Sequence, residues 1–255
     1  MLGLTGKRVI LTGGASGIGR ATAIRLVEEG CVVGIFDLDD AGSQETVRLC
    51  ANGPGMAVAY SVDIGEYSQV REAALAFEAA MGPTELLANI AGWDRAMNFL
   101  DSTVDFWDKV IRINLYGPLN VHHVVVRGMA ERGFGRVVNV SSDAARVGSS
   151  GESVYAAAKA GIAAFTKTLA RELARRGVTL NVVCPGPTDT PLFRSFAASA
   201  PGGAKLTDAL ARAIPMGRLG QPGDYPGLIA FLLSDDAKFI TGQTISVSGG
   251  LTMHG

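Results

Sequence analysis

A glycine-rich loop near the N-terminus constrains the fold of this chain more than any other feature. The sequence Thr-Gly-Gly-Ala-Ser-Gly-Ile-Gly occupies residues 12–19, between an apolar run and a segment of helical spacing. Its glycines allow a tight turn, the approach of a ligand to the backbone, and packing of the helix on the strand. The helix N-terminus then offers free N–H groups and partial positive charge to a pyrophosphate. The candidate contacts are Gly13, Ser16, Gly17, Ile18 and Gly19; the alternative is a purely structural turn.

Short apolar runs alternate with longer segments of helical spacing along the chain. Strands are expected over residues 9–11, 32–36, 56–62, 85–89, 136–140, 179–183 and 244–247. Helices are expected over residues 18–29, 40–51, 67–80, 103–131, 153–175 and 225–234. Strands that are apolar at nearly every position are typical of a parallel sheet buried by helices on both faces. The sequence therefore predicts an α/β fold, a single Rossmann-type domain over residues 1–255 with a doubly wound sheet of about seven strands.

Residues 187–224 interrupt this alternation. The segment is rich in Ala, Gly, Pro and Ser, and no strand is expected in it. Long connections of this kind are often functional lids. We expect this one to close over a substrate.

Composition excludes several classes of protein. The 255 residues include 23 Lys and Arg against 24 Asp and Glu, so no basic excess is available for nucleic-acid binding. Apolar residues make up 47% of the chain, which excludes intrinsic disorder. Cys31, Cys50 and Cys184 lie far apart without CxxC spacing, so neither a disulfide framework nor a metal site is expected. The chain shows neither a signal-peptide layout nor an apolar run of ~18 residues, and we expect a soluble cytoplasmic protein without membrane contact.

An acidic residue at the end of the second expected strand indicates which dinucleotide binds. Asp37 follows Gly19 by 18 residues, where a carboxylate accepts hydrogen bonds from ribose hydroxyls and repels a 2′-phosphate. Residues 37–40 contain no Lys or Arg, so NAD is expected rather than NADP. Asp63 follows the third strand and is a candidate adenine contact, or alternatively a helix N-cap.

Four polar residues form a candidate catalytic set. Tyr155 and Lys159 are four residues apart in a helical segment and therefore project from one face. A neighbouring cation stabilises phenolate, which would let Tyr155 act as general base or acid near neutral pH. Ser142, just past a strand, is placed to hold the substrate oxygen, and Asn114 to order a water leading to Lys159. Taken alone, a Tyr-x3-Lys pair is equally a surface contact or core packing.

Together these motifs resemble the short-chain dehydrogenase/reductase family over essentially the whole chain. The matching stretches are residues 12–19, Asn-Ile-Ala-Gly at 89–92, Asn114, Ser142, Tyr-Ala-Ala-Ala-Lys at 155–159, Pro-Gly-Pro-Thr at 185–188 and the tail 242–250. Two departures are Ile90, where Asn is usual, and Ser248, where Asp is common.

The resemblance implies roles for the matching residues. Tyr155 is the implied acid/base, with Lys159 lowering its pKa and holding the nicotinamide ribose; Ser142 orients the substrate and Asn114 supports proton relay. The implied cofactor contacts beyond the glycine loop and Asp37 are Asp63, Ile64, Asn89, Tyr155, Lys159, Pro185, Gly186 and Thr188. The family also implies a homotetramer. Apart from the resemblance, the only support for a homotetramer comes from the apolar segments 103–131 and 153–175, which are long enough to bury a second face on a partner.

Stretches that differ within the family indicate the substrate. Residues 93–94, 142–152, 184–190 and 246–253 resemble those of family members that oxidise 2-hydroxycyclohexanecarboxyl-CoA with NAD. We therefore expect that substrate or a similar β-hydroxyacyl-CoA. Candidate substrate contacts are Trp93, as a wall for an alicyclic ring, with Asp143, Arg146 and Arg194; Lys205 and Arg212 are further candidates for the anionic CoA. The alternatives are a packed Trp and ordinary solvated charges.

Two other functions remain open from the sequence. The first is a reductase of 3-oxoacyl thioesters, carried by acyl carrier protein, or of other ketones, using NADPH; Asp37 argues against it. The second is a nucleotide-binding regulator without turnover, against which the complete catalytic set argues.

Overall fold

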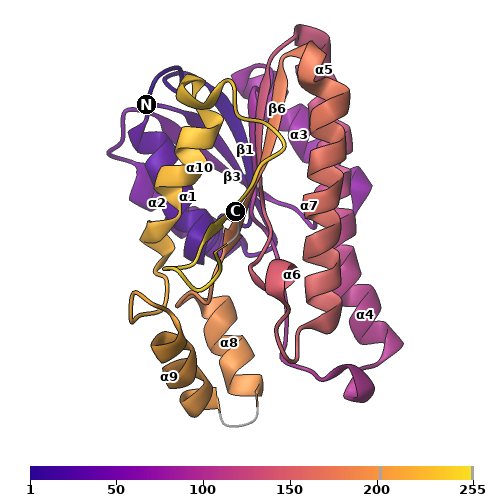
Figure 1. Cartoon of the computed structure of the whole chain (residues 1–255). Coiled ribbons are helices and arrows are strands. Elements are labelled where there is room, and N and C mark those ends of the chain that lie inside the picture. The colour runs from indigo at the N-terminus through magenta and orange to yellow at the C-terminus, as the bar shows by residue number, and fades with distance from the viewer. Residues whose placement is uncertain (201–202, 254–255) are drawn as a thin grey trace.

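The computed structural model describes residues 1–200 and 203–253 and has one sheet between two layers of helices (Figure 1). Seven parallel strands lie in the order β3-β2-β1-β4-β5-β6-β7. They are β1 (Arg8–Thr12), β2 (Val32–Asp37), β3 (Met56–Ser61), β4 (Leu86–Asn89), β5 (Gly135–Val140), β6 (Val178–Pro185) and β7 (Thr244–Val247). The doubly wound α/β fold predicted from the sequence is confirmed.

Alternate residues of the central strands face opposite layers of helices. In β1, Val9 and Leu11 lie in one apolar cluster with residues of α1 (Gly17–Glu28) and α10 (Pro226–Leu233). Ile10 lies in the other, with residues of α3 (Tyr67–Met81), α5 (Gly117–Arg132) and α7 (Ser153–Leu173). Both faces are buried, which explains why the strand sequences are apolar almost throughout. Figure 1 shows α1, α2 (Asp40–Cys50) and α10 on one side of the sheet and α3, α5 and α7 on the other.

The long helix expected over residues 103–131 contains a π-helical turn. The structure has α4 (Val104–Ile111), a π-helix at Arg112–Tyr116 and then α5. Asn114 lies in this turn and is fully buried. Its amide donates to the carbonyl oxygens of Val110 (2.9 Å) and Trp93 (2.7 Å) and accepts from the Trp93 N–H. π-Turns often mark functional sites, and this one directs Asn114 toward the loop after β4.

The expected lid, residues 187–224, contains two helices that the strand–helix alternation does not predict. They are α8 (Pro191–Ser199) and α9 (Gly203–Ala213), which project beyond the sheet (Figure 1). Residues 201 and 202 of this segment lie outside the described residues. The short α6 (Ala144–Val147) is a further addition. Among the helices of the described residues, none combines the length and apolar character needed to cross a membrane.

A buried polar network connects the strands with the helices behind them. Asn89 accepts a hydrogen bond from the Thr12 hydroxyl (2.8 Å), and its side chain is only 4% exposed. His122 is paired with the Pro118 carbonyl through Nδ1 (2.6 Å) and with the Asn139 amide through Nε2 (3.2 Å). Burial lowers the pKa of His122 from 6.5 to about 4, so this imidazole is neutral at pH 7.

His122 therefore makes folding stability depend on pH. Its folded pKa, about 4, lies below its ordinary value of 6.5, so the unfolded chain binds more protons between these values. Stability from this residue is then lost as pH falls below about 6.5. We expect the free energy of unfolding to fall by about 2 kcal/mol from this source between pH 7 and pH 5. Urea unfolding of His122→Gln should show that much less pH dependence, whereas exposed His123→Gln should behave like the parent chain.

Candidate active site

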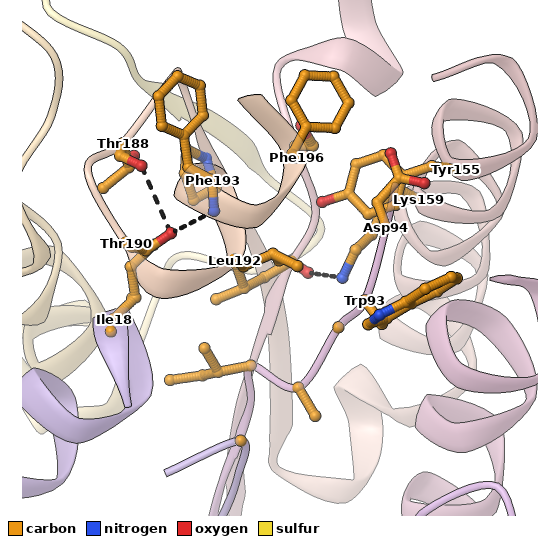
Figure 2. Close-up of a pocket in the computed structure, with 18 of the residues that line it drawn as sticks. Ile18, Trp93, Asp94, Tyr155, Lys159, Thr188, Thr190, Leu192, Phe193 and Phe196 are labelled. Carbon is orange, nitrogen blue, oxygen red and sulfur yellow. Dashed lines mark hydrogen bonds between the residues drawn. The ribbon is translucent and has the colours of Figure 1, made fainter. Parts of the chain in front are cut away.

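A cavity of about 870 Å³ lies at the carboxyl ends of the strands. The loops after β1, β2, β3, β4, β5 and β6 form one side of it, at the point where the strand order reverses beside β1. Open parallel sheets bind ligands at such reversal points. Apolar residues of α8 and α9 form the other side: Leu192, Phe193, Phe196, Leu206 and Leu210 (Figure 2 shows those of α8).

The glycine loop lines the cavity where it meets the start of α1. Gly13 and Gly17 have φ angles of +77° and +54°, a left-handed conformation that favours glycine. At Gly19 a Cβ would collide with the carbonyl oxygen of Gly13, so the helix approaches the turn more closely than any side chain permits. Ser16 is the N-cap of α1 and lines the cavity with Ile18, and its hydroxyl makes no capping bond. This glycine cradle at a helix N-terminus fits the pyrophosphate of a dinucleotide.

Asp37 lies at the end of β2 beside this loop. Its carboxylate accepts hydrogen bonds from the backbone N–H groups of Ala15 (2.9 Å) and Asp39 (3.0 Å), which fixes it at the cavity wall. Of the described residues that line the cavity, Lys109 and Lys159 are the basic ones, and neither belongs to this loop or to β2. Asp37 therefore places a carboxylate, and no basic side chain, at this part of the cavity wall among the described residues.

Asp63 and Ile64 line the cavity next to the end of β3. Asp63 forms an ion pair with Arg112 (3.0 Å) and accepts from the Gly65 N–H (2.8 Å). The N-cap of α3 is Glu66, so the alternative of Asp63 as that N-cap is wrong. Asp63 remains available as an adenine contact.

The structure brings Ser142, Tyr155 and Lys159 to one end of the cavity, and Asn114 is buried behind Gly92, which lines the cavity beside them. Tyr155 and Lys159 lie one turn apart on α7, with the Lys159 Nζ 5.7 Å from the centre of the Tyr155 ring (Figure 2). Lys159 donates to the Val140 carbonyl (3.0 Å), which fixes its otherwise flexible chain. A Cβ on Gly92 would lie 2.9 Å from the Asn114 oxygen and 3.1 Å from the Lys159 Nζ, so both groups converge on this glycine.

Burial shifts the pKa values of the two helix residues in opposite directions. It raises the pKa of Tyr155, with further increases from the negative charges of Glu152 and Asp94, whereas a hydrogen bond with Ser142 lowers it. Burial lowers the pKa of Lys159 from 10.5 to about 8. The expectation that Lys159 lowers the pKa of Tyr155 in the presence of a bound oxidised nicotinamide stays a prediction.

Several expected contacts lie elsewhere. Arg146 donates to Ser246 (2.9 Å) and to the Thr244 carbonyl (3.3 Å) on β7, outside the cavity lining. Arg194 pairs with Asp189 on the exposed side of α8, and the buried Asn89 belongs to the polar network described above. The structure therefore does not bring these three residues into the cavity. Lys205 and Arg212 are exposed on α9 and likewise do not line it.

The other expected contacts do line the cavity. They are Trp93, Asp143, Pro185, Gly186 and Thr188. Asp143 is anchored by the Ser246 hydroxyl (2.5 Å), and Thr188 by a hydrogen bond with Tyr225. Within the described residues, no group of three or more His, Cys, Asp or Glu is arranged to hold a metal.

Sequence reasoning assigned no individual role to Asp94 and Glu152, which lie in the stretches that indicated the substrate, and it missed the cation of Lys109 and the apolar residues of the lid helices. Glu152 comes three residues before Tyr155, so helical spacing was a usable signal for it. No local pattern marks Lys109, whose Nζ lies 4.0 Å from the centre of the Trp93 ring.

A glycine cradle, an acidic residue after β2 and a paired Tyr and Lys define a nicotinamide-dependent oxidoreductase. The family model described as enoyl-(acyl carrier protein) reductase matches residues 13–252. Acetoacetyl-CoA reductase of Shinella zoogloeoides is 39% identical over 94% of this chain and 96% of its own. Human (3R)-3-hydroxyacyl-CoA dehydrogenase is 38% identical over 96% and 95%. The 3-oxoacyl-[acyl-carrier-protein] reductase of Thermotoga maritima is 37% identical over 98% and 99%.

The crystal structure of levodione reductase is similar to this one, with a TM-score of 0.91 and 30% identity over 96% of this chain and 97% of that chain. The chain belongs to the short-chain dehydrogenase/reductase family. It is an oxidoreductase, and this family uses nicotinamide cofactors.

The glycine cradle can be tested with a single methyl group. In Gly19→Ala the new Cβ collides with the Gly13 carbonyl, which pushes α1 away from the turn. We expect the dissociation constant for NADH, measured by fluorescence titration, to rise more than tenfold while circular dichroism stays unchanged. Gly227→Ala is the matched control, because its Cβ meets no atom within 4 Å. Unchanged affinity in Gly19→Ala would contradict the assignment of the cradle.

Proposed function

We propose that this protein is an NAD-dependent dehydrogenase that interconverts the β-hydroxyl group and the ketone of an acyl-CoA. The observation that carries the proposal is the convergence of Ser142, Tyr155 and Lys159 at one end of a cavity whose other end is the glycine loop. The names of the relatives support a thioester substrate, since two of those above act on acetoacetyl-CoA or 3-hydroxyacyl-CoA. Within this class, the proposed substrate is 2-hydroxycyclohexanecarboxyl-CoA or a similar β-hydroxyacyl-CoA, with Trp93 beside the alicyclic ring.

Each residue of the catalytic set has a separate role in the proposed reaction. Ser142 and Tyr155 hold the substrate oxygen, and Tyr155 takes the hydroxyl proton during oxidation or returns it during reduction. A bound nicotinamide supplies or accepts the hydride. Lys159, with its pKa lowered to about 8, exchanges protons near neutral pH. Asn114 and Lys159 converge at Gly92, which suits a proton path that leaves Tyr155 through the ammonium group.

The proposed cofactor contacts follow the length of the cavity. The loop residues Gly13, Ser16, Gly17, Ile18 and Gly19 hold the pyrophosphate, and Asp37 the adenosine ribose. Asp63 and Ile64 lie beside the adenine, while Pro185, Gly186 and Thr188 lie beside the nicotinamide. The negative charge of Asp37 supports NAD over NADP.

The second candidate is a reductase of 3-oxoacyl thioesters that uses NADPH. The printed names of the Shinella zoogloeoides and Thermotoga maritima relatives favour it, because both are reductases of such compounds. Asp37 is the feature that argues against it. The third alternative is a regulator without turnover, and the presence of Ser142, Tyr155 and Lys159 together in the cavity argues against it.

The remaining expectations stay predictions. A homotetramer is expected from the family resemblance, with α4, α5 and α7 as the elements available for contact, and the location is expected to be cytoplasmic. We also predict that α8 and α9 close over the substrate.

Tyr155→Phe tests the proposed reaction. The variant keeps the ring and removes the proton carrier, so we expect turnover of 3-hydroxybutyryl-CoA with NAD⁺ to fall at least a thousandfold. Affinity for NADH should stay within about twofold, because the glycine loop is untouched. The parent enzyme should prefer cyclic and linear 3-hydroxyacyl-CoA over free secondary alcohols. Turnover of free alcohols alone would refute the CoA substrate, and an active Tyr155→Phe would refute the proton transfer.

Asp37→Ser tests the cofactor. Removing the carboxylate abolishes the repulsion of a 2′-phosphate, so we expect the ratio of kcat/KM for NAD⁺ to that for NADP⁺ to fall at least tenfold. Asp101→Asn, an exposed residue outside the cavity, is the control. A parent enzyme that binds NADPH more tightly than NADH would overturn the NAD proposal in favour of the second candidate.

A further inference from the structure

Two carboxyl groups lie at the catalytic end of the cavity without an assigned role. Asp94 follows the turn after β4, and Glu152 is the residue before α7, three positions before Tyr155. Asp94 is only 5% exposed, and its Oδ2 is buried without a hydrogen-bond partner. Figure 2 shows Asp94 on the same side of the cavity as Tyr155 and Lys159, opposite α8.

The charged groups around Asp94 do not neutralise it. The Lys159 ammonium group donates to the Val140 carbonyl (3.0 Å), and the Lys109 Nζ lies over the Trp93 ring (4.0 Å). The Arg95 guanidinium lies 5.5 Å from the centre of the Phe106 ring. Among the ion pairs of the described residues, none includes Asp94 or Glu152.

An unpaired carboxylate at such a position is costly, because burial removes its hydration. Burial raises the pKa of Asp94 from 3.8 to about 7. A backbone hydrogen bond from Arg95 opposes this increase, and the negative charge of Glu152 adds to it. Burial also raises the pKa of Glu152, which a hydrogen bond with Ser149 opposes. The cation of Lys159 lowers the pKa of Asp94, but its effect is smaller than those of burial, the Arg95 hydrogen bond and the Glu152 charge. At neutral pH Asp94 therefore retains a proton in part of the molecules.

A protonated carboxyl group is a hydrogen-bond donor, and the Oδ2 of Asp94 has no acceptor among the described residues. A β-hydroxyacyl thioester brings such an acceptor, since its carbonyl oxygen is two carbons away from the hydroxyl carbon. We propose that Asp94 donates a hydrogen bond to the acyl carbonyl oxygen of the substrate whose hydroxyl group Ser142 and Tyr155 hold. This inference rests on the proposed thioester substrate and gives the site a means of selecting the β position.

The test compares two substrates that differ only in the carbonyl. One is the N-acetylcysteamine thioester of 3-hydroxybutyrate, and the other is the thioether with CH₂ in place of C=O. The measured quantity is the kcat/KM value of the thioester divided by that of the thioether. This ratio cancels the steps common to both substrates, including the ionisation of Tyr155. Because Asp94 donates only when protonated, we expect the ratio for the parent enzyme to fall as pH rises above about 7.

Substitutions of Asp94 distinguish the presence of a hydrogen-bond donor from the titration of that donor. Asp94→Asn keeps an N–H donor that does not titrate, so the ratio should remain high and become independent of pH. Asp94→Leu removes the donor and should lower the ratio roughly tenfold at pH 6. Glu152→Gln removes the neighbouring negative charge and should move the midpoint of the pH dependence to lower pH, a shift that a purely structural role would not produce. Exposed Asp101→Asn should match the parent.

Three outcomes would overturn the inference, and one would instead overturn the proposed function. An unchanged ratio in Asp94→Leu, or a ratio for the parent enzyme that does not depend on pH, would exclude hydrogen bonding to the carbonyl. A preference for an amine-bearing alcohol that Asp94→Asn abolishes would identify Asp94 as a contact for a cationic substrate. Turnover of the thioether without turnover of either 3-hydroxybutyryl-CoA or the thioester would refute the thioester function itself.

Discussion

Apolar side chains on both faces of the parallel sheet leave the strands in contact with ligands only at their ends. Val9 and Leu11 face one layer of helices and Ile10 faces the other, so neither face of β1 is polar and open to a ligand. All seven strands run in parallel, and their carboxyl ends therefore meet at a single edge. The glycine loop, Asp37 and Ser142 each follow a different strand at this edge, which is why residues far apart in the chain line one cavity.

Desolvation controls the chemistry available at this edge. It opposes the charged form of every ionisable group, so it raises the pKa of Tyr155 and Asp94 and lowers that of Lys159. These opposite shifts bring the lysine and the aspartate to values of about 8 and about 7, where both exchange protons near neutral pH. Hydrogen bonds to backbone carbonyls hold Lys159 and Asn114 in place, so both side chains have little freedom to move.

Local patterns account for the parts of the site that the sequence predicts. A glycine loop between a strand and a helix, or a Tyr and a Lys four residues apart, has its geometry fixed by neighbouring backbone, so placement follows from spacing. Asn89 and Arg146 show the limit of that reasoning. Both are close in sequence to residues that line the cavity, yet Asn89 hydrogen-bonds to Thr12 inside the protein and Arg146 to β7, which is about a hundred residues away in the chain.

The sequence by itself determined the α/β class, the cradle at the first helix and the identity of the Tyr155 and Lys159 pair, because each depends on periodicity or short spacing. Tertiary structure decided which acidic and basic side chains reach the cavity, that α8 and α9 cover it, and that Asp94 is buried beside Tyr155. These properties depend on packing between elements distant in the chain, and the burial that shifts the pKa values exists only once those elements are assembled.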